Sequence, residues 1–85
     1  MEKIKSAAIR YRGGFFVLPA PARHGDIFRT MTNEQIKEVE IEDQGFMTTE
    51  DQYVNRVRAR QIAEVAGQLL PTAYKTDELF TEDIW

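Results

Sequence analysis

The chain opens on IKSAAIRYRGGFFVL at residues 4–18, which has the pattern of a β-hairpin. Side chains along residues 4–12 alternate between two faces, as they do in a strand. The Gly-Gly pair at 13–14 suits a tight turn because both residues accept a positive φ without steric cost. Residues 15–18, Phe-Phe-Val-Leu, are of the aromatic and branched types that strands favour. The stretch therefore predicts two antiparallel strands joined by a glycine turn.

The remaining chain alternates between helical and extended patterns. Residues 23–31 and 56–70 place apolar side chains at helical spacing. In the second of these helices the expected buried stripe is Ile62, Val65, Ala66 and Leu69. Residues 32–43 are acidic and fit neither period, so we expect a loop with an edge strand. Very short strands are expected at 45–48 and 52–54. The predicted fold class is α+β, a small antiparallel sheet with two helices packed on one face.

Three residues near the carboxyl end carry local expectations. Gly67 costs helix stability, so we expect it to mark a close contact between the second helix and the sheet. Pro71 is expected to end that helix. Trp85 is expected to dock its ring on the protein, because exposure would leave a large apolar area in water.

Length and composition predict one domain, residues 1–85, with an ordinary globular balance of 42% hydrophobic and 29% charged residues. Its core is thin, and we expect a homo-oligomer that covers further surface. The absence of cysteine excludes disulfides and thiolate chemistry. Residues 15–22, the longest apolar run, contain two prolines and fall far short of the roughly 20 residues of a membrane span. We therefore expect a soluble, cytoplasmic protein.

Charge is unevenly distributed along the chain. Residues 1–33 carry six basic and two acidic residues, and residues 34–85 carry five basic and twelve acidic residues. Duplex DNA-binding domains are normally basic, whereas this chain has a net charge of −3. We therefore expect no binding to duplex DNA.

The basic residues suggest a site for a small phosphorylated ligand. Arg23 and His24 stand at the expected start of the first helix, where backbone N–H groups favour an anion. Arg10 and Arg12 on one face of the first strand, with Tyr11 or Tyr53 as a stacking surface, would complete it. Arg56, Arg58 and Arg60 offer a second cluster, and intrahelical pairing toward Glu64 is the alternative for Arg56 and Arg60. The candidate ligand-binding residues are Arg10, Arg12, Arg23, His24, Tyr53 and Arg56.

Catalytic and metal-binding patterns are sparse. The single histidine, His24, has Asp26 as its nearest acidic neighbour, and two ligands are fewer than a catalytic zinc takes. The only serine, Ser6, lies inside the first strand without a nucleophile motif. We expect no metal, no cofactor and no catalytic residue, and a His24-dependent phosphodiesterase stays as a third alternative.

The alternative to a functional role is a structural one, in which His24 caps or orients the start of the first helix. We further expect that alanine at Arg23 or His24 abolishes biological activity while leaving stability nearly unchanged, as at surface positions.

Three segments resemble a known group of proteins. PAPARHGDI at residues 19–27 resembles a PAPARHxD segment, and QGFMT at 44–48 followed by YVNR and IAEVAGQ resembles a QGF(V/L)T…IAxxAGQ pattern. LFTEDIW at 79–85 is similar to a terminal LxSEDLW. The family is that of small, mostly uncharacterised proteins of tailed bacteriophages and prophages. The resemblance covers residues 4–85 except the variable stretch 32–43.

This resemblance implies a phage origin, a single domain and a place of action in the host cytoplasm. Roles in host takeover, counter-defence or the virion follow from that origin. With the arginine set, it favours a non-enzymatic binding protein that counters an antiviral defence by sequestering a nucleotide signal, cyclic nucleotides included. The runner-up is an inhibitor that binds a host defence protein through its acidic surface. The acidic residues are Glu34, Glu38, Glu40, Glu42, Asp43, Glu50 and Asp51.

Overall fold

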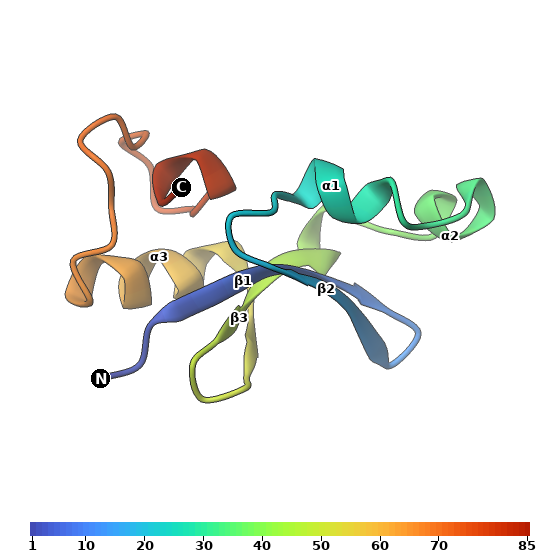
Figure 1. Cartoon of the computed structure of the whole chain (residues 1–85), viewed down its shortest axis with the longest axis horizontal. Helices are drawn as coiled ribbons and strands as arrows, with labels where there is room; N and C mark the ends of the chain where they lie inside the picture. Colours follow the sequence, from blue (N-terminus) through green and yellow to red (C-terminus); the bar gives the residue numbers. More distant parts are fainter.

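The computed structural model describes residues 1–85, and Figure 1 shows a twisted sheet with the helices gathered to one side of it. The strands are β1 (Ile4–Tyr11), β2 (Gly14–Pro19), β3 (Gln44–Thr48) and β4 (Tyr53–Val54). The α-helices are α1 (His24–Phe28), α2 (Asn33–Lys37) and α3 (Arg56–Val65). Two 3-10 helices, η1 (Ile41–Asp43) and η2 (Thr81–Asp83), complete the chain. The α+β prediction is confirmed. No helix combines the length and apolarity that a membrane span requires.

The sheet has the order β2-β1-β3-β4, and every neighbouring pair is antiparallel. The long strand β1 lies in the middle, so side chains on its two faces meet different surroundings. Ala7 and Ile9 point to the side that α1 and α3 cover, and they join a buried core with Phe46. Ala8 and Arg10 point to the other side, which no helix covers.

The core forms where α3 and the carboxyl-terminal segment meet the sheet. Ala59 and Ala63 of α3 are fully buried, so small side chains let this helix approach the strands. Leu79 and Ile84 of the carboxyl-terminal segment join the same core. Trp85 donates from its indole Nε1 to the Ala22 carbonyl at 3.1 Å, which confirms the expected docking.

The hairpin turn is shifted by one residue from the predicted position. Tyr11 pairs with Gly14, so the two turn residues are Arg12 and Gly13, with φ values of 47° and 79°. Two central residues with positive φ are typical of a type I′ turn, whose twist matches the flanking strands. Arg12 therefore lies in the turn and not on the strand face of Arg10.

Three other expectations were wrong. The 32–43 segment holds α2 and η1 in place of a loop with an edge strand, and Thr32 begins α2 by accepting from the Gln35 N–H at 3.2 Å. The second predicted helix, α3, ends at Val65 and not at Pro71 as expected. Gly67 follows it with φ 69° and open space where a Cβ would stand, so positive φ, not close packing, explains this glycine.

Candidate functional site

Arg56 is the first residue of α3, and its side chain reaches across to three other parts of the chain. Its Nε donates to the Leu79 carbonyl at 3.2 Å, and the guanidinium carbon lies 4.9 Å from the centre of the Phe80 ring. Its Nη2 makes long contacts of 3.5 Å with Gln44 Oε1 and with Nδ1 of His24. Burial lowers the pKa of Arg56, while nearby acidic residues oppose that shift. The guanidinium thus joins α3, β3, α1 and the carboxyl-terminal segment.

His24 lies inside the protein at the start of α1, with 6% of its surface exposed. Its Nε2 lies 2.8 Å from the Gly45 carbonyl, and its ring packs edge-on against Phe46. Because a carbonyl oxygen only accepts, Nε2 carries the proton and Nδ1 turns its lone pair toward Arg56. Burial lowers the pKa of His24, the Gly45 hydrogen bond opposes this, and Arg56 lowers it further. The surface position assumed for His24 is therefore wrong.

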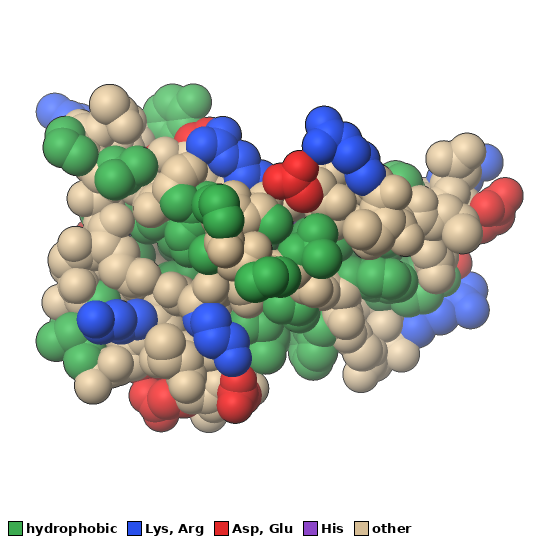
Figure 2. Space-filling view, viewed as in Figure 1, with side chains coloured by type: hydrophobic (Ala, Val, Ile, Leu, Met, Phe, Trp, Pro, Cys, Tyr) green, Lys and Arg blue, Asp and Glu red, His purple; other side chains and the backbone are tan.

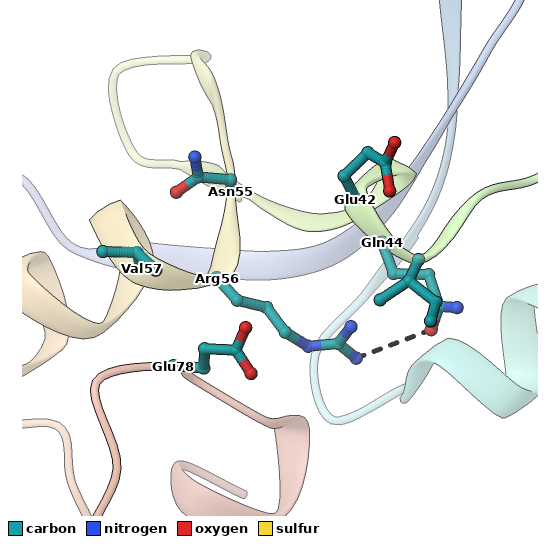
Figure 3. A pocket seen from close by; sticks show the side chains of 7 residues that line it. Glu42, Gln44, Asn55, Arg56, Val57 and Glu78 are labelled. Atoms are coloured by element: carbon teal, nitrogen blue, oxygen red, sulfur yellow. Dashed lines mark hydrogen bonds between the residues drawn. The ribbon is translucent and has the colours of Figure 1, made fainter.

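A polar pocket of about 310 Å³ opens beside the Arg56 guanidinium. Figure 3 shows the side chain extending from α3 toward Gln44, with Glu78 and Glu42 on either side of it. The Asn55 side chain is turned to the start of α3, where it accepts from the Arg58 N–H at 2.8 Å. The lining residues are Ile41, Glu42, Gln44, Asn55, Arg56, Val57 and Glu78.

Arg56 differs from most other arginines because no carboxylate oxygen lies within 4.0 Å of it. Arg10, Arg12, Arg29 and Arg60 all pair with acidic side chains at 2.7–3.1 Å. The predicted intrahelical pairing toward Glu64 is thus confirmed for Arg60 and absent for Arg56. The pocket therefore presents one arginine charge that the protein leaves without a direct ion pair.

Arg23 immediately precedes His24 in the chain and is exposed. Its Nη2 donates to the main-chain oxygen of Trp85 at 2.7 Å. The main-chain N–H of Arg23 donates to Asp26 Oδ2 at 2.8 Å, so the Asp26 carboxylate already lies at the start of α1. The Thr81 hydroxyl lowers the pKa of Glu82, and Arg23 and Arg56 lower it further. An anion site here thus depends on arginine side chains and not on the end of this five-residue helix.

The remaining predicted residues lie elsewhere in the fold. Arg10 pairs with Asp43 at 3.1 Å and lies over the Tyr53 ring at 5.3 Å, on the uncovered face of the sheet. Burial raises the pKa of Tyr53. Arg12 binds both oxygens of Glu38, which also accepts from the Tyr11 hydroxyl at 2.9 Å. The structure therefore brings His24 into contact with Arg56 and places Arg10 and Arg12 in ion pairs elsewhere. Tyr53 forms no hydrogen bond with His24 or Arg56, but its hydroxyl donates to the carbonyl of Glu42, which lines the pocket.

Sequence reasoning missed the partners that surround Arg56. Gln44, Glu42 and Glu78 line the pocket, and Phe80 supports the guanidinium from another side. Gln44 and Phe80 belong to the QGF and LFTEDIW segments, and His24 belongs to PAPARHGD. These three segments, far apart in the chain, meet at Arg56, so their joint appearance in one chain was the available signal.

The seven candidate acidic residues divide into paired and unpaired ones. Glu38, Asp43 and Asp51 pair with basic side chains, while Glu34, Glu40, Glu42 and Glu50 are exposed outside such pairs. Figure 2 shows acidic and basic side chains interspersed over one side of the molecule. No three His, Asp or Glu side chains stand close enough together to hold a metal ion.

Comparison with protein families finds a match to the family described as phage T4 y16D protein, over residues 3–85. No curated protein matches the chain, and no solved structure does. The match extends across the hairpin, the Arg56 pocket and the carboxyl-terminal segment.

Proposed function

The chain belongs to the phage T4 y16D protein family, and we propose that it is a non-enzymatic protein that binds a small phosphorylated ligand at Arg56. Its place of action is the cytoplasm of the infected host, where it holds a nucleotide signal of an antiviral defence away from its receptor. The observation that carries the proposal is the Arg56 guanidinium, fixed by the protein and left without a carboxylate partner beside an open pocket.

The pocket chemistry suits a ligand with both an anionic group and hydroxyl or amino groups. The planar guanidinium of Arg56 binds phosphate oxygens with directed N–H donors. The Glu42 and Glu78 carboxylates on either side accept hydrogen bonds from sugar hydroxyls or base amino groups. A nucleotide carries both kinds of group, whereas inorganic phosphate has no sugar hydroxyl and no base amino group. A volume of about 310 Å³ falls at the lower end of ligand pockets.

Binding without catalysis is supported by the position of His24. Its Nε2 is held by Gly45, and its Nδ1 faces Arg56, so neither nitrogen is directed at the pocket as a base. His24 thereby acts as a positioning residue that fixes one side of the guanidinium. The ligand should be recovered unmodified after the protein is heat-denatured.

Thermal unfolding with a panel of phosphorylated compounds tests the proposal. Nucleoside monophosphates, cyclic mononucleotides, cyclic dinucleotides and inorganic phosphate are added separately, each in large excess. At 100 times its dissociation constant a ligand stabilises the folded state by about 2.7 kcal/mol, which raises Tm by about 10–20 °C in a chain of this size. We expect at least one nucleotide to do so, and phosphate alone to do less.

Matched variants connect the effect to the pocket. Arg56→Gln should abolish the Tm shift, while Arg58→Ala, on the same helix and exposed, should retain it. Glu42→Gln, which removes no side-chain contact inside the protein, guards against an Arg56 variant that fails to fold. It should weaken nucleotide binding more than phosphate binding. Equal shifts in wild type and Arg56→Gln, or no shift with any compound, would refute the proposal.

The runner-up function has its own support in the unpaired carboxylates Glu40 and Glu42 of the exposed η1 region. A host defence protein with a basic surface would bind there without regard to nucleotides. Glu40→Gln with Glu42→Gln should then abolish inhibition, while Arg56→Gln retains it. Consumption of a nucleotide with turnover, stopped by His24→Ala, would favour the phosphodiesterase alternative.

A further inference from the structure

One face of the sheet carries large apolar side chains and has no helix over it. Phe15 and Val17 of β2 are 48% and 41% exposed, and Met47 and Tyr53 are partly exposed beside them. The strand register places all four on the side opposite the buried core. None of them is packed against that core. We call Phe15, Val17, Met47 and Tyr53 the open face.

The open face is rigid because its aromatic rings are fixed by their neighbours. The Tyr53 ring lies across Gly45, where a Cβ would stand 2.6 Å from the ring, and its hydroxyl donates to the Glu42 carbonyl at 3.2 Å. Phe15 stacks on Tyr53 with ring centres 5.2 Å apart. A surface already ordered before binding loses less conformational entropy when it is covered.

The charges at the borders of this face favour a second copy of the chain over a polyanion. Arg10 pairs with Asp43 at one end of β1, and Lys5 pairs with Asp51 at the other. Each cation is therefore neutralised within the protein, which leaves little net charge for nucleic acid phosphates to contact. A surface bearing both signs at its rim and apolar groups at its centre is complementary to itself under a two-fold rotation.

We propose that the open face is a self-association surface, on which a second copy packs sheet against sheet about a two-fold axis. The strand spacing and rise give the face an extent of about 15 Å across and about 20 Å along the strands. One face is thus about 300 Å², so two such faces would bury about 600 Å² in total, which is the size of a weak, transient interface. The dimer should therefore dissociate in the high micromolar range.

Sedimentation equilibrium between about 10 and about 500 μM measures this association, because micromolar affinities change the dimer fraction over that range. The wild-type chain should shift from about 10 kDa toward about 20 kDa as concentration rises, by mass action. Phe15→Asp should remain monomeric, and Val17→Thr, which keeps a β-branched side chain, should weaken the dimer at least tenfold. Val65→Asp is the matched control, because Val65 is 74% exposed on α3, away from the sheet.

Cross-linking provides an independent readout, since the chain contains no cysteine. Val17→Cys should give a cross-linked dimer with a short bis-maleimide, whereas Val65→Cys should not. A wild-type chain that stays monomeric at every concentration overturns the proposal, and a dimer that persists in folded Phe15→Asp overturns the choice of surface. Binding of a labelled single-stranded oligonucleotide that Phe15→Asp abolishes, with no dimer, assigns the face to nucleic acid instead.

Discussion

Nη2 of Arg56 lies 3.5 Å from Nδ1 of His24, and the histidine faces it as a neutral acceptor. This relationship follows from the other side of the ring, where the Gly45 carbonyl takes the Nε2 proton. A protonated His24 would present a second positive charge to Arg56 in a buried setting, which both burial and Coulomb repulsion oppose. The pair therefore couples the protonation of His24 to the placement of Arg56.

Stability should fall on mild acidification because of His24. Its pKa is lowered in the folded protein, so below about pH 6.5 the unfolded chain binds a proton that the folded chain does not. The free energy of unfolding should be constant above that pH, decrease below it, and level off beneath the folded-state pKa. Urea midpoints between about pH 7.5 and about pH 5 measure this change.

A substitution of His24 is a specific control for this experiment, because the chain has one histidine. His24→Gln should remove the pH dependence in this window and should cost about 2 kcal/mol at neutral pH through a lost buried hydrogen bond and imperfect packing. Arg23→Ala, which alters an exposed side chain, should keep the wild-type pH dependence. An unchanged slope in His24→Gln would show that another group titrates.

Gly45 should not tolerate a side chain. A Cβ there would collide with the Val54 carbonyl oxygen and would lie 2.6 Å from the Tyr53 ring. We expect Gly45→Ala to lower the free energy of unfolding by about 2 kcal/mol or more. Gly25→Ala is the control, because its Cβ would meet nothing within 4 Å and a helical alanine is favoured by roughly 0.5–1 kcal/mol. Equal unfolding midpoints for the two variants would contradict this account.

Local sequence patterns were sufficient to predict the hairpin and the existence of α3, because neighbouring residues determine both. The predicted apolar stripe of α3 was right for Ile62, which is 5% exposed, and wrong for Val65, which is 74% exposed. The fully buried positions against the sheet are Ala59 and Ala63. The close approach of α3 to the sheet selects small side chains, and hydrophobic size alone does not carry that information.

Sequence patterns predicted the candidate site less completely than the fold. The charge pattern identified Arg56 and His24 as members of one site, but their contact depends on residues 32 positions apart. Arg12 was grouped with Arg10 on strand alternation, and a turn shifted by one residue sent it to Glu38 instead. The partners of a charged side chain are set by tertiary contacts, which single-residue patterns do not specify.

Gly67 provides a test of why a glycine stands just beyond α3. Its φ of 69° is in the left-handed region, yet a Cβ would meet no atom within 4 Å. Gly67→Ala should therefore cost about 1–2 kcal/mol from backbone strain alone. Gly67→Asn should cost less, since asparagine accepts this conformation more readily. Thermal or urea unfolding separates the two explanations: a larger loss with the bulkier asparagine would mean that packing space, not φ, is limiting.

Asp83 should be the acidic residue on which the carboxyl-terminal segment most depends. It is fully buried, and its two carboxylate oxygens accept from the Tyr74 N–H at 2.9 Å and the Phe80 N–H at 2.8 Å. Arg60 lies 4.0 Å away and supplies the nearest positive charge. Asp83→Ala would leave both N–H groups and part of Arg60 unsatisfied inside the protein.

We expect Asp83→Ala to cost about 3 kcal/mol or more, because each buried donor left without an acceptor costs about 1–3 kcal/mol. Asp83→Asn keeps the shape and one acceptor oxygen, so it should cost less. Asp77→Ala, at an exposed position in the same segment, is the matched control and should stay near wild type.

Fluorescence of Trp85, the only tryptophan, reports release of this segment separately from global unfolding by circular dichroism. Since Leu79 packs in the core and its carbonyl accepts from Arg56, loosening the segment should also weaken ligand binding at the pocket. Stability and Trp85 fluorescence equal to those of Asp77→Ala would show that the Asp83 hydrogen bonds do not hold the segment in place.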